Sequence, residues 1–249
     1  MTLLINNKFF VIFLAPFLLG VITIFGFSPY NFTLINFFTF PILLFLISLI
    51  KKRTQSKYRK KKSNKYFFYL GFAFGFGFFL FGNYWISISL THDEMFKNLI
   101  PFAFVLIPLF LSIFFGLAIL TVGYFSEKKI YFILFFASAF SIFEFLRGNI
   151  LSGFPWNIIS YTWAWSEEII QILSIIGTYS LSLISITFFC IPFLFFQKKD
   201  VKKNIVFLFV FLTIFVCNYL FGHYKMNNNK YDFDESIYVK IVSPSFSLK

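Results

Sequence analysis

The sequence contains few charged residues and few of the side chains that bind metals or form disulfides. Charged residues fill 13% of the 249 positions, against roughly 25% in an ordinary soluble domain. The chain has two histidines and two cysteines, and Cys190 and Cys217 each lie inside an apolar run without a CxxC partner. This pattern excludes a disulfide framework and a cysteine metal site. We expect both cysteines to be small buried hydrophobic residues.

Hydrophobic residues fill 59% of the chain, and they come in long blocks rather than at the periods of amphipathic helices or strands. Lipid is therefore the expected solvent, and we interpret the forty-five Phe residues as generic lipid-facing bulk. Because a spanning helix needs about 20 apolar residues, we predict an all-α polytopic membrane protein with seven transmembrane helices. The expected spans are 9–27, 32–50, 66–90, 99–123, 130–147, 168–196 and 204–221.

Basic residues gather in alternate loops. Nine lie in 51–65 and more in 128–129 and 198–203, whereas the opposite loops hold only Lys97 and Arg147. The positive-inside rule then places the N-terminus in the cytoplasm and the residues after 222 outside, which in a bacterium is the periplasm. The same distribution argues against nucleic acid as a partner. We interpret 51–65 as a stop-transfer anchor on anionic lipid, with a nucleic-acid or lipid-headgroup patch as the alternative.

The C-terminal residues differ in character from the rest. Residues 222–235 are polar, and 236–242 alternate like a strand with Ile237, Val239 and Ile241 on one face. A single strand cannot bury its face or pair its backbone. We therefore expect a transmembrane domain over 1–222, followed in 223–249 by a linker and the first strand of an α/β domain whose remainder is missing.

Small residues repeat in the third predicted span, where Gly71 and Gly75 form one small-xxx-small pair and Ala73 and Gly77 another. This spacing predicts close helix packing. A smooth wall for a lipid chain is the alternative.

Two charged residues, Glu144 and Arg147, lie three positions apart near the outer end of the fifth predicted span, so they share one face of that helix. Charges at membrane depth are costly and usually paired. They either form an ion pair that fixes the helix end, or they anchor a phospholipid head group or the loop that follows.

That loop contains Gly153-Phe154-Pro155-Trp156, and Pro155 cannot continue the helix. We expect Trp156 and the aromatic residues of 161–165 at the outer interface, either as an aromatic belt or facing a substrate. The outer side shows no nucleophile–base spacing and no metal-ligand pattern in the sequence.

The chain resembles the apolipoprotein N-acyltransferases, and the matching motifs run in the order found in that family. They are Gly26-Phe27-Ser28-Pro29-Tyr30, the Gly/Phe-rich third span ending in Asn83-Tyr84-Trp85, Glu144-Phe145-Leu146-Arg147-Gly148, Gly153-Phe154-Pro155-Trp156, and the strand 237–242 leading into Ser247-Leu248-Lys249. The resemblance covers this whole chain but only about the N-terminal half of the family's length.

The resemblance implies an enzyme of the bacterial inner membrane. It acts as a monomer and without metal or organic cofactor. An acyl chain moves from phospholipid to a Cys thiolate, and then to the N-terminal diacylglyceryl-cysteine of an apolipoprotein. The family's Glu-Lys-Cys triad lies in a periplasmic nitrilase-like domain, so this chain holds no catalytic residue of that set and is expected to be inactive alone. The resemblance places Trp156 and its loop in the lipid groove, with Pro155, Phe154, Gly153, Arg147 and Glu144 as further groove candidates.

Two other functions compete with this interpretation. One is a non-catalytic lipid-binding scaffold, or the partner of a separately encoded catalytic chain. The other is a small transporter, which the sequence favours least, because the spans hold almost no charge and show no internal repeat.

Overall fold

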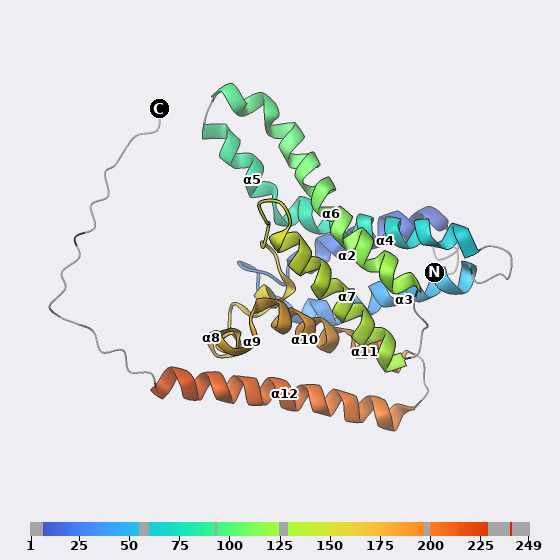
Figure 1. Ribbon diagram of the computed structural model, residues 1–249, viewed down its shortest axis with the longest axis vertical. Helices are drawn as coiled ribbons and strands as arrows, with labels where there is room; N and C mark the ends of the chain where they lie inside the picture. The colour runs from blue at the N-terminus through green and yellow to red at the C-terminus, as the bar shows by residue number, and fades with distance from the viewer. Residues whose placement is uncertain are drawn as a thin grey trace.

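A computed structural model describes residues 7–54, 60–92, 94–124, 129–196, 200–228 and 240, and Figure 1 shows the arrangement of its helices. The regular elements of the described residues are all helical. The longer ones are α2 (Ala15–Ile24), α3 (Asn36–Thr54), α4 (Lys60–Gly82), α6 (Ile100–Tyr124), α7 (Lys129–Asn149), α10 (Thr178–Cys190) and α12 (Val201–Asn228). The short ones are η1 (Phe10–Leu14), η2 (Thr33–Ile35), α5 (Tyr84–Ser89), η3 (Leu90–His92), η4 (Glu94–Leu99), η5 (Ile159–Trp163), α8 (Glu167–Ile170), α9 (Leu173–Ile176) and α11 (Pro192–Phe195).

Six helical segments of the described chain are long and apolar enough to cross a membrane. They are Thr33–Thr54, Asn64–Gly82, Glu94–Tyr124, Ile130–Asn149, Thr178–Phe195 and Val201–Asn228. The prediction of an all-α multi-pass membrane protein is confirmed. The first of the seven predicted spans is present as a shorter apolar helix, Phe10–Ile24. It ends before the turn at Gly26-Phe27-Ser28-Pro29-Tyr30.

The predicted span over 168–196 is not one continuous helix. It is divided into α8, α9, α10 and α11, and only Thr178–Phe195 has membrane-spanning length. The break before α10 lies at Gly177, whose φ of 75° is incompatible with a right-handed helix. The apolar composition of 168–176 concealed this break, because hydropathy does not depend on backbone direction.

Helix α4 is the central helix of one side of the bundle and packs most extensively against α6 and α2. A Cβ atom on Gly71 would lie 2.4 Å from the carbonyl oxygen of Phe115 in α6. A Cβ atom on Gly77 would lie 2.2 Å from the carbonyl oxygen of Phe17 in α2. The small residues of α4 therefore serve close packing on two faces, since any larger side chain at either position would collide with a neighbouring backbone.

Many of the phenylalanines fill the interior rather than face lipid. The rings of Phe74, Phe115 and Phe140 are completely buried, and those of Phe115 and Phe140 have centroids 4.4 Å apart. The interpretation of Phe as lipid-facing bulk is wrong for this core, and it stays a prediction for exposed rings such as Phe102 and Phe209. Composition alone does not assign an apolar ring to lipid or to the interior.

Helix α12 lies along one edge of the molecule in Figure 1. Only 17% of the most apolar 18-residue stretch of this helix is buried inside the protein. The helix continues to Asn228, seven residues beyond the predicted end of the last span at 221. The predicted strand over 236–242 lies outside the described residues, apart from Lys240.

Candidate functional site

The loop after α7 folds back over the end of that helix. The amide of Gly153 donates to the carbonyl of Ile150 at 3.0 Å, and the amide of Phe154 donates to the carbonyl of Arg147 at 2.9 Å. Gly153 has a φ of 74°, and a Cβ atom there would lie 2.4 Å from the carbonyl oxygen of Gly148. Only glycine fits this turn, because both its conformation and its space exclude a side chain.

Arg147 holds the same loop by its side chain. It is 1% exposed, and its Nη1 atom donates to the carbonyls of Phe154 and Trp156, both at 2.8 Å. Its guanidinium carbon lies 5.0 Å from the centre of the Phe79 ring, at the distance of a cation–π contact. One cation from α7 thus fixes the path of 154–156 and packs on the aromatic core.

Glu144 anchors the far end of the loop. Its carboxylate is completely buried, accepts a bond from the amide of Ile159 at 3.0 Å, and accepts another from the hydroxyl of Ser182 in α10. In the described part of the chain Glu144 and Arg147 make no direct ion pair. Of the alternatives left by the sequence, the geometry shows two separate anchors of the following loop.

The loop also docks on the end of α4 and the start of α5. The amide nitrogen of the Asn157 side chain donates to the Asn83 side-chain oxygen at 2.8 Å. The rings of Trp85 and Trp156 meet edge to face with centroids 5.4 Å apart. A Cβ atom on Gly82 would lie 2.5 Å from the Asn157 amide nitrogen, so glycine at this position makes room for the contact.

A cavity of about 600 Å³ opens where three segments distant in sequence meet. Its lining combines the turn at 27–30, the residues Tyr84 and Trp85, and the loop residues Trp156 and Asn157. Trp156 is one of these lining residues and is 53% exposed. The volume lies within the range of small-molecule sites, about 300–1,000 Å³.

A second cavity, of about 390 Å³, shares the same loop. Arg147, Gly153 and Phe154 line it on one side. Its other wall is the apolar face of α6, formed by Leu106, Ile107, Phe110, Leu111 and Phe114. Figure 1 shows α5 and the first turns of α6 extending away from the rest of the bundle beside this loop. The loop therefore separates an aromatic cavity from an apolar one.

The structure brings together five of the six predicted groove residues. Trp156 lines the first cavity, Gly153, Phe154 and Arg147 line the second, and Glu144 anchors the loop between them. Pro155 is exposed and lines neither cavity. It shapes the loop by its fixed φ.

The aromatic residues after the loop do not all form an interfacial belt. Trp163 is 7% exposed, and its indole donates to the Ser185 hydroxyl at 2.9 Å inside the bundle. Trp165 is exposed, and its indole donates to Thr33 at 2.7 Å. Burial, followed by the nearby Tyr179, raises the pKa of Tyr161 above its ordinary value.

Sequence reasoning missed Asn157 and Ser182, which complete the loop's contacts to α4 and α10. Neither lies in a local pattern that signals its partner. The expectation for the cysteines was half right, because Cys190 is buried, but Cys217 is exposed on α12.

Comparisons with known proteins show the family to which this chain belongs. The family model for the apolipoprotein N-acyltransferase N-terminal domain matches residues 19–191. The apolipoprotein N-acyltransferase of Rickettsia prowazekii is 34% identical over 231 residues, which cover 92% of this chain and 43% of that protein. The Rickettsia typhi protein is 33% identical over 232 residues, with the same 92% and 43% coverage. The Brucella melitensis protein is 29% identical over 239 residues, covering 94% of this chain and 44% of its own length.

The chain thus spans less than half the length of these curated relatives. The matched residues include helices α4 and α6, the Glu144 and Arg147 anchors and the loop at 153–157. The chain belongs to the apolipoprotein N-acyltransferase family, as its N-terminal membrane domain.

Proposed function

We propose that this chain is the lipid-gathering membrane part of an enzyme that transfers an acyl chain from phospholipid to the N-terminal diacylglyceryl-cysteine of apolipoproteins. The observation that carries the proposal is the convergence of the 27–30 turn, Tyr84 and Trp85 with Trp156 around one cavity. These are the segments in which the sequence resembles the family. The motifs that carry the resemblance are far apart in sequence, and in the folded chain they line the same cavity.

The two cavities suit the two parts of a phospholipid. The larger one combines aromatic walls with the Asn157 amide and the Ser28 residue, a lining typical of the membrane interface. The smaller one runs along the apolar face of α6, and Arg147 and Ser152 are the polar side chains among its described lining residues. We assign the donor head group to the first and one acyl chain to the second.

The roles of the loop residues follow from their contacts. Trp156 is an exposed aromatic residue in the wall of the larger cavity and belongs to the loop that Arg147 and Glu144 hold, and we assign it direct contact with substrate. Arg147 and Glu144 are positioning residues, because they hold the backbone on both sides of Trp156 rather than face the cavity that it lines. A shift of the loop by an ångström would misplace the ring.

We propose that the nucleophile comes from the family's nitrilase-like domain. A Cys thiolate attacks the acyl ester carbonyl, a lysophospholipid leaves, and a thioester forms. The free amine of the diacylglyceryl-cysteine then attacks the thioester, an amide forms and the thiol is released. Cys190 is buried in the bundle and Cys217 lies on α12, and neither lines the two cavities beside the loop. We therefore expect these 249 residues to form no acyl-enzyme alone.

The proposal includes an orientation in the bacterial inner membrane. The basic residues at the start of α4 and the end of α3 favour the cytoplasmic side. Gly82, at the other end of α4, then brings the larger cavity to the periplasmic surface. The phospholipid and apolipoprotein substrates would be met there.

Replacing Trp156 by alanine in the full-length protein tests the proposal. We expect acyl transfer from a fluorescent phospholipid to a diacylglyceryl-cysteine peptide to slow by about tenfold or more, because the cavity loses the aromatic ring that the loop contributes to its wall. Membrane insertion, followed with reporter fusions, should not change. Trp165→Ala is the matched control, since Trp165 has the same exposure and lies outside both cavities. Unchanged turnover in Trp156→Ala would remove this residue from the substrate site.

A further inference from the structure

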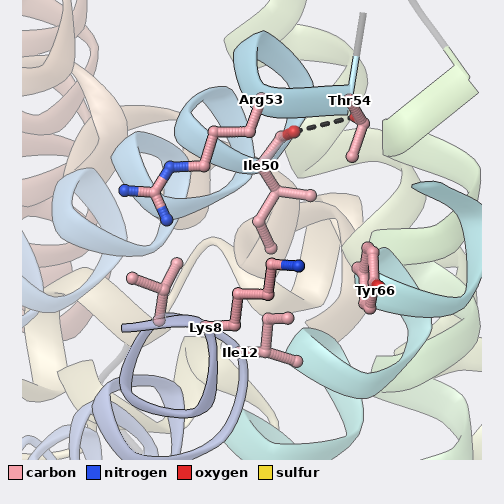
Figure 2. Close-up of a pocket in the computed structure, with 7 residues that line it drawn as sticks. Lys8, Ile12, Ile50, Arg53, Thr54 and Tyr66 are labelled. Atoms are coloured by element: carbon pink, nitrogen blue, oxygen red, sulfur yellow. Dashed lines mark hydrogen bonds between the residues drawn. The ribbon is translucent and has the colours of Figure 1, made fainter. Parts of the chain in front are cut away.

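Three helices meet around a separate small cavity of about 100 Å³ at the other end of the bundle (Figure 2). Its lining comes from the first turns of the N-terminal helix, the last turn of α3, and Tyr66 near the start of α4. Tyr66 and Gly82 lie sixteen positions apart on α4. At about 1.5 Å per residue, this cavity is roughly 24 Å from the candidate substrate site.

The cavity has an apolar floor and a cationic rim. Val11, Ile12 and Ile50 are buried and form the floor. Lys8 and Arg53 are exposed and come from two different helices. In Figure 2 the Lys8 amine reaches between Ile50 and Tyr66, and the Arg53 guanidinium extends beyond Ile50 on the other side. No acidic side chain is among the described residues that line it.

The backbone of the N-terminal helix is irregular where it contributes to this floor. Phe10–Leu14 is a π-helical segment, a rare conformation that is frequent at functional sites. Val11 and Ile12, which are adjacent in sequence, are both turned inward by this wide turn. The π-helical turn therefore coincides with the two adjacent residues, Val11 and Ile12, that contribute to the apolar floor.

An exposed aromatic strip begins at the edge of the cavity. Phe9 and Phe13 flank Val11 and Ile12 in sequence, and their ring centroids are 5.6 Å apart. Tyr69, one turn beyond Tyr66, continues the strip with its ring 5.7 Å from that of Phe13. All three side chains are exposed, so the strip offers lipid chains a surface next to the cationic rim.

The geometry points to a binding site for one anionic phospholipid, separate from the proposed acyl-donor cavities. The phosphodiester binds between Lys8 and Arg53, and the acyl chains follow the strip of Phe9, Phe13 and Tyr69. A free phosphate would contact only Lys8 and Arg53 and would gain nothing from the strip of Phe9, Phe13 and Tyr69, so a lipid is the better occupant. The neighbouring basic residues of α3, Lys51 and Lys52, add to the local attraction for anionic head groups.

Native mass spectrometry of the full-length protein in detergent tests this site. We expect the protein to retain one molecule of phosphatidylglycerol in preference to phosphatidylcholine. Lys8→Gln/Arg53→Gln should lose one tightly bound phosphatidylglycerol and weaken its affinity by about tenfold or more, because each basic residue near the head group contributes to the attraction. Lys202→Gln/Lys203→Gln is the matched control, with the same charge change at exposed positions of α12.

Each outcome decides the proposal. Equal retention by wild type and Lys8→Gln/Arg53→Gln would overturn it, and so would an equal loss in the control, which would indicate only a general charge effect. Displacement of phosphatidylglycerol by millimolar inorganic phosphate would show that the lipid chains contribute nothing. Trp156→Ala should keep this lipid, so failure of the acyl-donor assignment and failure of this site are distinguishable. If the double variant is unstable, Lys8→Gln alone, at an exposed position, replaces it in the same measurement and should also weaken the retention of phosphatidylglycerol.

Discussion

The two sides of the helix bundle are held together by different contacts. On one side, Gly71 and Gly77 let the backbones of α6 and α2 approach α4 until no side chain fits between them. On the other, α12 is attached mainly through α8, with the Asn218 side chain donating to the carbonyl of Ile169 at 3.0 Å. Gly222 allows one close approach there, because a Cβ atom would lie 1.9 Å from the carbonyl oxygen of Glu168.

The difference shows what holds helices together in lipid. Lipid tails are as apolar as Leu or Phe, so an apolar helix face gains little by leaving them. α4 is integrated because small residues allow extensive van der Waals contact with two neighbours. α12 has an equally apolar sequence but few small residues and few polar bonds, and most of its surface stays outside the protein. Apolarity brings a helix into the bilayer, and close contact determines its place in the bundle.

Leucine substitutions at the two glycines sharpen this comparison most strongly. Gly77→Leu should destabilise the whole bundle by about 3 kcal/mol or more, because the new side chain meets the Phe17 backbone and helices must separate. Gly222→Leu should release α12 from α8 and leave the α2–α4–α6 packing intact. Unfolding in detergent followed by circular dichroism, with cross-linking between α12 and α8, measures both. Equal effects of the two variants would contradict the contrast between the sides.

The loop anchors should show a smaller effect, confined to the loop. Arg147→Met removes the donor to two carbonyls and should destabilise the 153–157 loop by about 2 kcal/mol. Arg147→Lys keeps the charge but loses the planar guanidinium that packs over the Phe79 ring, so it should recover only part of the loss. Protease susceptibility reports on the loop and thermal stability reports on the bundle, so measuring both shows whether the effect is confined to the loop. Full rescue by lysine would show that charge rather than geometry holds the loop.

Two phenylalanines on α12 give the smallest expected effects. Phe211 is 9% exposed and its ring stacks near Phe188, with centroids 6.3 Å apart, whereas Phe209 is 63% exposed. Phe211→Ala should destabilise the attachment of α12 by about 1 kcal/mol through lost ring contacts. Phe209→Ala should change it by less than about 0.5 kcal/mol, because lipid fills the space. A larger loss for Phe209 in the same detergent unfolding assay would indicate an undescribed contact.

Parts of the site were accessible from sequence and parts were not. The i, i+3 spacing of Glu144 and Arg147 and the glycine–proline turn after them predicted a polar helix end followed by a fixed loop. The prediction stopped at the choice between an ion pair and a loop anchor, because that choice depends on Ser182 and Ile159, which pack against Glu144 only in the folded bundle. Likewise, the belt of tryptophans looked uniform, and only packing turned Trp163 inward to Ser185.

The sequence by itself determined that this chain is a helical membrane protein, because long uncharged runs must cover their own backbone polar groups in lipid. It also determined the family, through motifs that stay recognisable one by one. Only the tertiary structure decided which phenylalanines form the core, where the 168–196 run breaks, and that the 27–30 turn, Trp85 and Trp156 share one cavity. Hydropathy measures the preference of each residue for lipid, whereas these outcomes depend on distances between residues far apart in the chain.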